Sequence, residues 1–285
     1  ATTFLYDSFN YSTGSLGTVG SPTWVKNGTT ADPTVQNVGG LTYPGLQVSG
    51  NTLSLQYDGS GVVPGPAGTD GTTISSGITS GNLYYSFLMK VTAVQTLGGN
   101  GFATGGNLTN GSFMAGLETL AATNAPTAGA SAAPLLIRSG DPTNQFATTY
   151  QLGTAKTATT ADRQWYTAQS FTTGPNAETV FVVLKYSIDP VNGDSASLFI
   201  NPTPGSSEPA AQLAVAAGTA LVGATNGIRS FFVRNNSVEP DTMLIDELRV
   251  ADTWSEVTPA AVSEPATLAL FGLGLAGFIF RRWRS

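Results

Sequence analysis

The 285-residue chain contains no cysteine and no histidine. The absence of cysteine excludes stabilisation by disulfide bonds, and the absence of histidine removes the commonest metal ligand and the commonest general base. Asp, Glu, Lys and Arg make up only 11% of the residues, whereas about 25% is usual. The hydrophobic content of 41% is sufficient to fill a sizeable core. We therefore expect a domain that is stabilised by core burial and strand pairing.

Positive charge is scarce in most of the chain. Residues 1–265 contain 9 Lys and Arg against 18 Asp and Glu, so their net charge is near −9, while residues 266–285 contain three arginines and no acid. Nucleic-acid binding depends on a clustered basic patch. The sequence of residues 1–265 shows no such cluster, and it therefore predicts no nucleic-acid partner.

Residues 1–258 have the sequence pattern of an all-β domain, in which short runs of β-branched and aromatic residues are separated by Gly, Asn, Ser, Thr and Pro. The expected strands cover residues 4–9, 53–57, 83–94, 180–188, 196–200, 228–234 and 243–250. Turn residues at 189–194 favour a hairpin between the fourth and fifth of these strands. Residues 121–133 and 202–209 are expected to be surface loops. The pattern predicts a β-sandwich of two sheets with about six strands each.

The C-terminal segment has a different character. Residues 266–280 carry no charge, and Arg281, Arg282, Trp283 and Arg284 follow directly. An apolar run with a basic end suits a lipid bilayer. At about 1.5 Å per residue the run spans about 22 Å, which is less than the roughly 30 Å hydrocarbon core, so crossing would require snorkelling arginines and an interfacial tryptophan. We expect a sandwich domain at 1–258, a linker at 259–265 and a short transmembrane helix at 266–285.

Ser263, Glu264 and Pro265, followed by the apolar run and the arginine cluster, resemble the PEP-CTERM sorting signal of Gram-negative bacteria. The family usually has proline where this chain has Ser263. The resemblance implies export, recognition of the tripeptide by an exosortase, which is a membrane-embedded protease, and a location in the cell envelope, at the cell surface or in an extracellular matrix. Because export requires a signal peptide, we expect that Ala1 follows a cleavage site.

A second resemblance rests on segments at both ends of the sandwich domain. Residues 4–16, 183–186, 199–202 and 245–254 are similar to the concanavalin A/LamG-like jelly roll. That fold implies that the first and last strands pair, so residues 4–9 and 243–250 should be neighbours. Lectins and glycoside hydrolases share the fold, which therefore does not decide between binding and catalysis.

Candidate catalytic groups are few. A retaining glycosidase needs two carboxylates about 5 Å apart, and the jelly-roll hydrolase patterns E-x-D-x-x-E and E-x-D-x-E do not occur. Asp246 and Glu247 are adjacent on an expected strand and should face opposite sides, as should Lys185 and Tyr186. We interpret Asp246 as a partly buried acceptor for backbone N–H groups or Arg249, with calcium binding and catalysis as alternatives. No catalytic residue is predicted.

Calcium is the one cofactor that the second resemblance suggests, because LamG-like domains often bind it through Asp, Asn and carbonyl oxygens. Asp189, Asn192 and Asp194 place three oxygen-bearing side chains within six residues. The alternative interpretation, which we favour, is an ordinary Asn-Gly turn with acidic flanks.

A carbohydrate platform would need exposed aromatic side chains, for which Trp24, Tyr84, Trp165 and Tyr166 are candidates. Aromatic residues on strands are more often core residues, and we favour that interpretation here. The sequence thus predicts an exported, non-enzymatic protein with a structural or adhesive role and polysaccharide as its partner. A carbohydrate-active enzyme on the same fold is one alternative. A self-associating subunit of an extracellular fibre, with the apolar tail buried in the assembly, is another.

Overall fold

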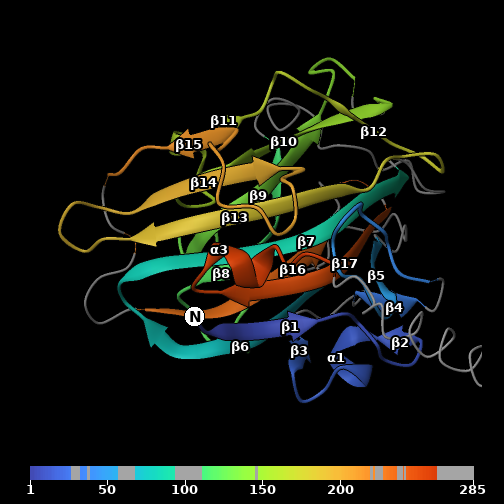
Figure 1. Ribbon diagram of the computed structural model, residues 1–285, viewed down its shortest axis with the longest axis horizontal. Helices are drawn as coiled ribbons and strands as arrows, with labels where there is room; N and C mark the ends of the chain where they lie inside the picture. The colour runs from blue at the N-terminus through green and yellow to red at the C-terminus, as the bar shows by residue number, and fades with distance from the viewer. Residues whose placement is uncertain are drawn as a thin grey trace, which may run out of the picture.

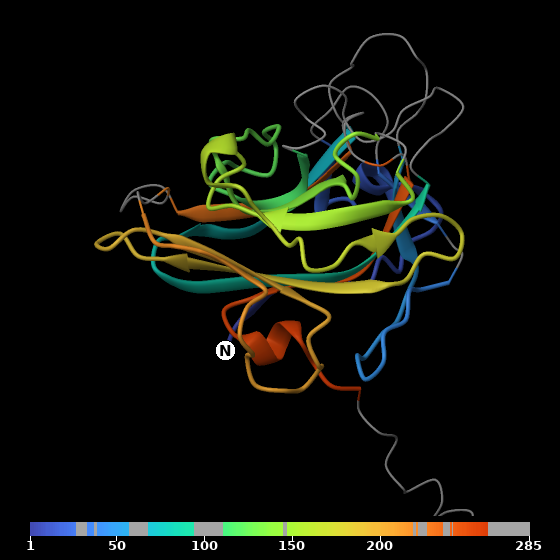
Figure 2. The ribbon, with the colours of Figure 1, turned by 90° about the horizontal axis from the view of Figure 1, so that it is seen from above.

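Two antiparallel β-sheets pack face to face in the computed structural model (Figure 1, Figure 2). The structure describes residues 1–26, 33–36, 39–56, 68–93, 111–144, 147–218, 221, 227–235, 240 and 242–261.

The first sheet has nine strands. In spatial order they are β15 (Leu213–Val215), β14 (Ser195–Ile200), β13 (Val180–Ile188), β7 (Gly81–Ala93), β17 (Thr242–Ala251), β5 (Thr52–Gln56), β4 (Thr34–Gln36) and β2 (Gly14–Ser15), and β1 (Thr3–Asp7) pairs with β17 off this path.

The second sheet has eight strands. Their order is β11 (Gln164–Trp165), β10 (Thr149–Thr154), β9 (Ser131–Ser139), β8 (Ser112–Glu118), β16 (Ile228–Asn235), β6 (Gly68–Ile78) and β3 (Trp24–Lys26), and β12 (Phe171–Thr172) pairs with β10. The helices of the described residues are all short: α1 (Leu16–Val19), the 3-10 turn η1 (Thr160–Asp162) and α3 (Trp254–Val257).

The main core lies between the sheets, and alternation along each strand selects the side chains that enter it. In β7, Tyr85, Phe87 and Met89 belong to this core, whereas Tyr84 and Leu88 belong to a smaller apolar cluster on the outer face of the nine-stranded sheet. β13 is buried on both faces except at Lys185 and Ser187. Such two-sided burial explains its nearly continuous apolar sequence.

Two predicted pairings are confirmed. β13 and β14 form the expected hairpin, with Val182 opposite Ile200 and Ser187 opposite Ser195. β1 and β17, from opposite ends of the domain, are antiparallel neighbours in which Tyr6 lies opposite Arg249. The fold is therefore a jelly-roll β-sandwich, as the sequence predicts.

The outer face of the nine-stranded sheet is partly covered by α3 and by the loop that precedes β15 (Figure 2). Trp254 in α3 packs edge-on against Phe199, and its indole N–H donates to the carbonyl of Ser206 at 2.9 Å. After α3 the chain stays on this face, because Ala260 forms a β-bridge with Leu46.

The sheets are larger than the six strands expected for each. The additional strands are short edge strands of two or three residues, such as β2, β11 and β12, which carry too few residues for a periodic pattern. The expected loop at 121–133 is also too long. Ser131 already begins β9, where Ala132 and Ala133 are fully buried.

The predicted membrane segment, the sorting tripeptide Ser263–Pro265 and the basic cluster Arg281, Arg282, Trp283 and Arg284 lie outside the described residues. Within the described ranges, no helix has the length and apolar character needed to span a membrane.

Candidate functional site

A β-bulge in β17 brings an unusual set of polar side chains to the outer face of the nine-stranded sheet. Its register against β7 shifts between Asp246 and Arg249, and Glu247 has a positive φ of 55°. Ile245 and Leu248 enter the main core, so both residues between them, Asp246 and Glu247, point outward. The expectation that these two carboxylates face opposite sides of the sheet is therefore wrong, because the bulge inserts one extra residue into the alternation.

Glu247 holds the centre of this outward-facing network. Its Oε2 accepts from Arg249 Nη2 at 2.6 Å and from the Tyr6 hydroxyl at 3.2 Å, and its Oε1 accepts from the backbone N–H of Ser49. The Glu247 side chain is fully buried and that of Arg249 is 7% exposed. The Arg249 guanidinium also lies 4.6 Å from the centre of the Tyr6 ring, a cation–π contact. Tyr6, Glu247 and Arg249 thus fix one another.

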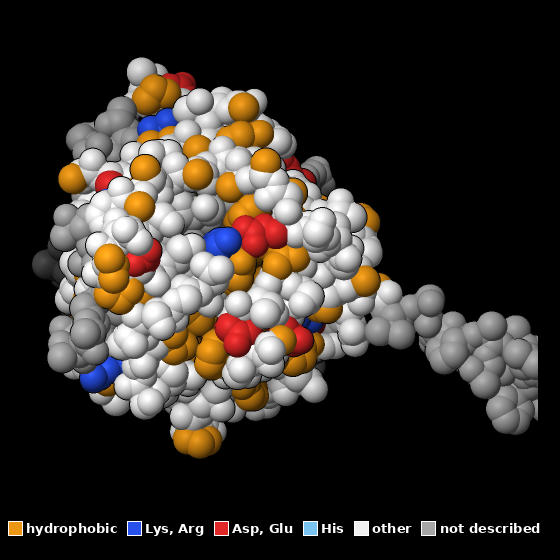
Figure 3. Space-filling model, turned by 60° about the vertical axis from the view of Figure 1, so that its left-hand side comes forward, with side chains coloured by type: hydrophobic (Ala, Val, Ile, Leu, Met, Phe, Trp, Pro, Cys, Tyr) orange, Lys and Arg blue, Asp and Glu red, His pale blue; other side chains and the backbone are white. Residues whose placement is uncertain are grey.

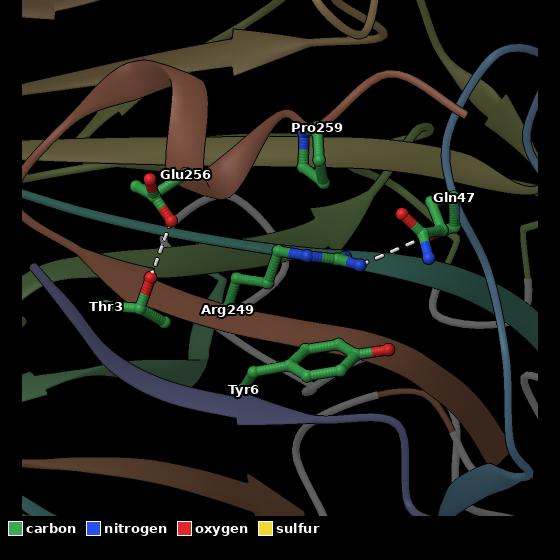
Figure 4. A pocket seen from close by; sticks show the side chains of 6 residues that line it. All are labelled: Thr3, Tyr6, Gln47, Arg249, Glu256 and Pro259. Atoms are coloured by element: carbon green, nitrogen blue, oxygen red, sulfur yellow. Dashed lines mark hydrogen bonds between the residues drawn. The ribbon is translucent and has the colours of Figure 1, made fainter. Parts of the chain in front are cut away.

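A hollow of about 270 Å³ opens beside this network (Figure 4). It is lined by Thr3, Tyr6, Gln47, Arg249, Glu256 and Pro259. Figure 4 shows Arg249 extended over the Tyr6 ring toward Gln47, with Glu256 and Thr3 at the other end of the hollow. The volume is near the lower end of the range of small-molecule sites.

Asp246 lies next to this network, but its carboxylate accepts from backbone N–H groups. Its Oδ2 accepts from the N–H of Leu41 at 2.7 Å, its Oδ1 accepts from the N–H of Glu247 at 2.7 Å, and the side chain is fully buried. A Cβ on Gly40 would lie only 2.8 Å from Oδ2. Burial raises the pKa of Asp246 to about 7, against the effect of the two backbone N–H donors. The interpretation of Asp246 as a buried acceptor for backbone N–H groups is confirmed.

Glu118, at the end of β8 in the other sheet, is a second buried carboxyl. It is 1% exposed, and burial raises its pKa to about 7, although the N–H of Thr127 donates to it. The two described carboxyls whose pKa values approach neutrality are thus both sealed from solvent, and neither can touch a substrate.

These two carboxyls predict that stability falls as the pH rises. Their folded pKa values lie above the value of about 4 in an unfolded chain, so their stabilising effect is complete below that value and is lost as the pH rises through about 7. We expect a higher melting temperature at about pH 5 than at about pH 8. Asp246→Asn should flatten this dependence, whereas Glu256→Gln, at an exposed position, should leave it unchanged. Equal slopes for the two variants in a thermal melt series would contradict the assignment.

A second polar surface lies on the outer face of the eight-stranded sheet, and we call it the arginine face. It consists of Phe113, Arg138, Gln151, Arg163, Trp165 and Arg234. Arg138 points outward because its neighbour Ile137 enters the main core. Its Nη2 donates to Gln151 Oε1 at 2.8 Å on the adjacent strand, and its guanidinium lies 4.5 Å from the centre of the Trp165 ring.

The other two guanidinium groups of the arginine face continue this surface. Arg234 lies 3.9 Å from the centre of the Phe113 ring, and Arg163 donates to the carbonyls of Gly111 and Ala158. Burial, followed by the positive charge of Arg234, lowers the pKa of Arg163. Three guanidinium groups therefore lie close together on this face, although Arg234 is only 7% exposed. On the side of the molecule shown in Figure 3, the Lys and Arg side chains of the described residues are few and scattered.

The four aromatic candidates for a carbohydrate platform have separate locations. Trp24 is 1% exposed in the core, where its indole N–H donates to Asp7 at 2.6 Å. Tyr84 is 4% exposed and donates to Glu208, and Tyr166 is half-buried against the main core. Trp165 is half-buried on the arginine face. The structure thus does not bring the four together.

The calcium candidates form a hydrogen-bonded turn. Asp189 Oδ1 accepts from the N–H groups of Val191 and Asn192, and its Oδ2 accepts from the Asn192 amide. Asp194 is fully buried and accepts from the Tyr186 hydroxyl and the N–H groups of Asp189 and Leu221. Protons thus point at the oxygens that a calcium ion would need, so the described residues suit a turn rather than a cation site.

The sequence did not indicate that the residues lining the hollow, or those of the arginine face, lie together. The residues lining the hollow are spread from Thr3 to Pro259, and the arginines of the arginine face lie at positions 138, 163 and 234. No spacing in the sequence joins them. Only the pairing of β1 with β17, which the jelly-roll resemblance implies, could have placed Tyr6 beside Arg249.

Comparison with known families concerns the C-terminal segment. Residues 261–284 match the PEP-CTERM protein-sorting motif. This match confirms the prediction from Ser263, Glu264 and Pro265 and the segment that follows them. The motif indicates an exported protein that is sorted to the cell envelope through exosortase-dependent processing. No curated protein matches the chain in sequence.

Solved structures of similar fold include enzymes and lectins. An alginate lyase in complex with an alginate tetrasaccharide is 10% identical, with a TM-score of 0.48 over 86% of this chain and 95% of the other. An endo-β-1,4-glucuronan lyase from the fungus Trichoderma reesei is 13% identical, with a TM-score of 0.43 over 84% and 98%. Lectin II from Ulex europaeus is 12% identical, with a TM-score of 0.42 over 88% and 99%. These similarities concern the fold, so the distinction between binding and catalysis has to be drawn from the side chains of this chain.

Proposed function

We propose that this exported protein binds acidic polysaccharide at the cell surface or in the extracellular matrix of a Gram-negative bacterium, without catalysing a reaction. The observation that supports the proposal is the arginine face, where Arg138 lies over Trp165, Arg234 lies over Phe113 and Arg163 is close enough to Arg234 for their charges to interact. The role is structural or adhesive.

Guanidinium groups suit this partner because their planar fork of N–H donors matches the geometry of carboxylate and sulfate groups. A uronic-acid polymer repeats such a group at every sugar. The remainder of the domain is acidic, since residues 1–265 have a net charge near −9. A polyanion would therefore be repelled from most of the sandwich surface and attracted to the arginine face.

Catalysis is disfavoured by the position of the acid groups. The two described carboxyls with pKa values of about 7, Asp246 and Glu118, are buried and bonded to backbone N–H groups. The Tyr6 hydroxyl is held between Ser49 and Glu247, and Arg249 beside it is already neutralised by Glu247. Lys185 and Tyr186 face opposite sides of β13, with Lys185 paired to Glu208 and Tyr186 in the core.

The test uses the full-length chain and alginate as the acidic polymer. We expect saturable binding that weakens as the salt concentration rises, because exposed charges are screened. Arg138→Gln should weaken binding roughly three- to tenfold, the loss expected for one charge-assisted hydrogen bond. The control is Arg229→Gln, which changes the charge equally at an exposed arginine elsewhere on β16.

Two outcomes would overturn the proposal. One is equal weakening by the two arginine variants, which would show that net charge and not the arginine face governs binding. The other is the appearance of unsaturated or reducing chain ends in incubations with alginate. Turnover that disappears in Glu247→Gln would establish the enzyme alternative.

A further inference from the structure

We propose that the hollow beside Tyr6 is a second saccharide site, selective for a neutral pyranose, on the sheet opposite the arginine face. A protein with both sites would hold a neutral and an acidic polysaccharide together. The bridging activity rests on the proposed function, whereas the neutral-sugar site does not.

The hollow presents hydrogen-bonding groups that the protein leaves unused. The Arg249 guanidinium makes three hydrogen bonds: Nη2 donates to Glu247 Oε2 and to the carbonyl of Gln47, and Nη1 donates to the carbonyl of Glu247. A guanidinium carries five N–H groups. Two therefore have no partner among the described residues, although the Arg249 side chain is only 7% exposed. Arg249 lines the hollow, where a ligand hydroxyl can accept from these donors.

Gln47 and Glu256 complete the polar lining. The Gln47 side chain is exposed, and its amide bonds to no described residue. Glu256 is exposed and accepts from the Thr3 hydroxyl at 2.7 Å, through Oε2. Planar amide, guanidinium and carboxylate groups can each bind two neighbouring hydroxyl groups of a sugar.

Tyr6 provides the apolar contact that a sugar ring needs. It is 48% exposed, and it is the one exposed aromatic side chain among the residues that the structure describes. Its hydroxyl is held by Ser49 and Glu247, and the Arg249 guanidinium lies over its ring. The ring is therefore fixed before a ligand arrives, which lowers the entropic cost of binding.

The charge of the hollow selects against uronic acids. Glu247 forms an ion pair with Arg249 at 2.6 Å and neutralises its charge. The net charge of the lining is therefore negative, because Glu256 also lines the hollow. A carboxylate on the ligand would meet Glu256 without a compensating cation. A neutral pyranose avoids this repulsion and still satisfies the unused N–H groups.

The first experiment measures binding of laminarihexaose, a neutral β-glucan oligosaccharide, to the full-length chain by calorimetry. Gln47→Ala should weaken binding roughly three- to tenfold, as loss of one or two hydrogen bonds predicts. Tyr6→Phe retains the ring and should bind better than Tyr6→Ala. The control Gln169→Ala removes an exposed amide outside the hollow and should leave binding unchanged. Absence of binding, or equal effects of Gln47→Ala and Gln169→Ala, would overturn the neutral-sugar site.

The second experiment tests bridging, with fluorescent alginate captured on an immobilised neutral β-glucan through the protein. Wild-type protein should capture it, whereas Gln47→Ala and Arg138→Gln should each reduce capture by weakening a different contact. Binding of laminarihexaose without binding of alginate would refute only the proposed binding of acidic polysaccharide. Separate binding of both polymers without capture would refute bridging alone.

Discussion

Replacing Glu247 with alanine should lower the free energy of unfolding by about 3–5 kcal/mol, the usual effect of breaking a buried ion pair. The variant leaves the buried Arg249 guanidinium without its carboxylate and removes the acceptor of the Tyr6 hydroxyl and of the Ser49 N–H. In the wild-type protein these contacts are made by a fully buried side chain. Urea denaturation at neutral pH measures the difference.

The matched control is Glu256→Ala. Glu256 has the same side chain and lines the same hollow, but it is exposed and accepts a hydrogen bond from Thr3. We expect a change of about 0.5 kcal/mol or less for this surface position. Unfolding of the two variants at the same urea concentration would contradict the interpretation that Glu247 is the centre of the network.

Removing residues 266–285 should release the protein from the cell envelope without unfolding it. The described residues form both sheets and the core between them. The chain is hydrogen-bonded to the sandwich up to Ala261, whose N–H donates to the carbonyl of Gly45 at 2.8 Å. The PEP-CTERM motif at 261–284 is the segment that indicates sorting. Cell fractionation should therefore show a shift from the envelope to the medium.

The melting temperature of the truncated chain separates sorting from folding. It should lie close to that of the full-length protein, since the sandwich is closed without the removed residues. A large decrease, or aggregation of the truncated chain, would show that the apolar segment belongs to the fold. Retention of a well-folded truncated chain in the envelope would instead contradict its role in sorting.

The sequence by itself determined the features that depend on neighbouring residues. The strands β7 and β13, the hairpin of β13 with β14, and the all-β class follow from local alternation and turn residues. The sorting motif is equally local, because it is a short contiguous segment that can be recognised without a fold. The pairing of β1 with β17 followed from the resemblance to a jelly roll, not from periodicity.

Only the tertiary structure decided which side chains meet. The bulge in β17 turns Asp246 and Glu247 to the same face, and no residue pattern indicated it, because the register of one strand depends on its partner across the sheet. The arginine face gathers positions 138, 163 and 234, which are 25 and 71 residues apart in sequence. Arg138 and Arg234 are brought near each other by strand order, because only β8 separates β9 from β16, and Arg163 joins them from the segment between η1 and β11. The arginines of residues 1–265 are scattered in the sequence, and three of them thus lie close together only in the folded sandwich.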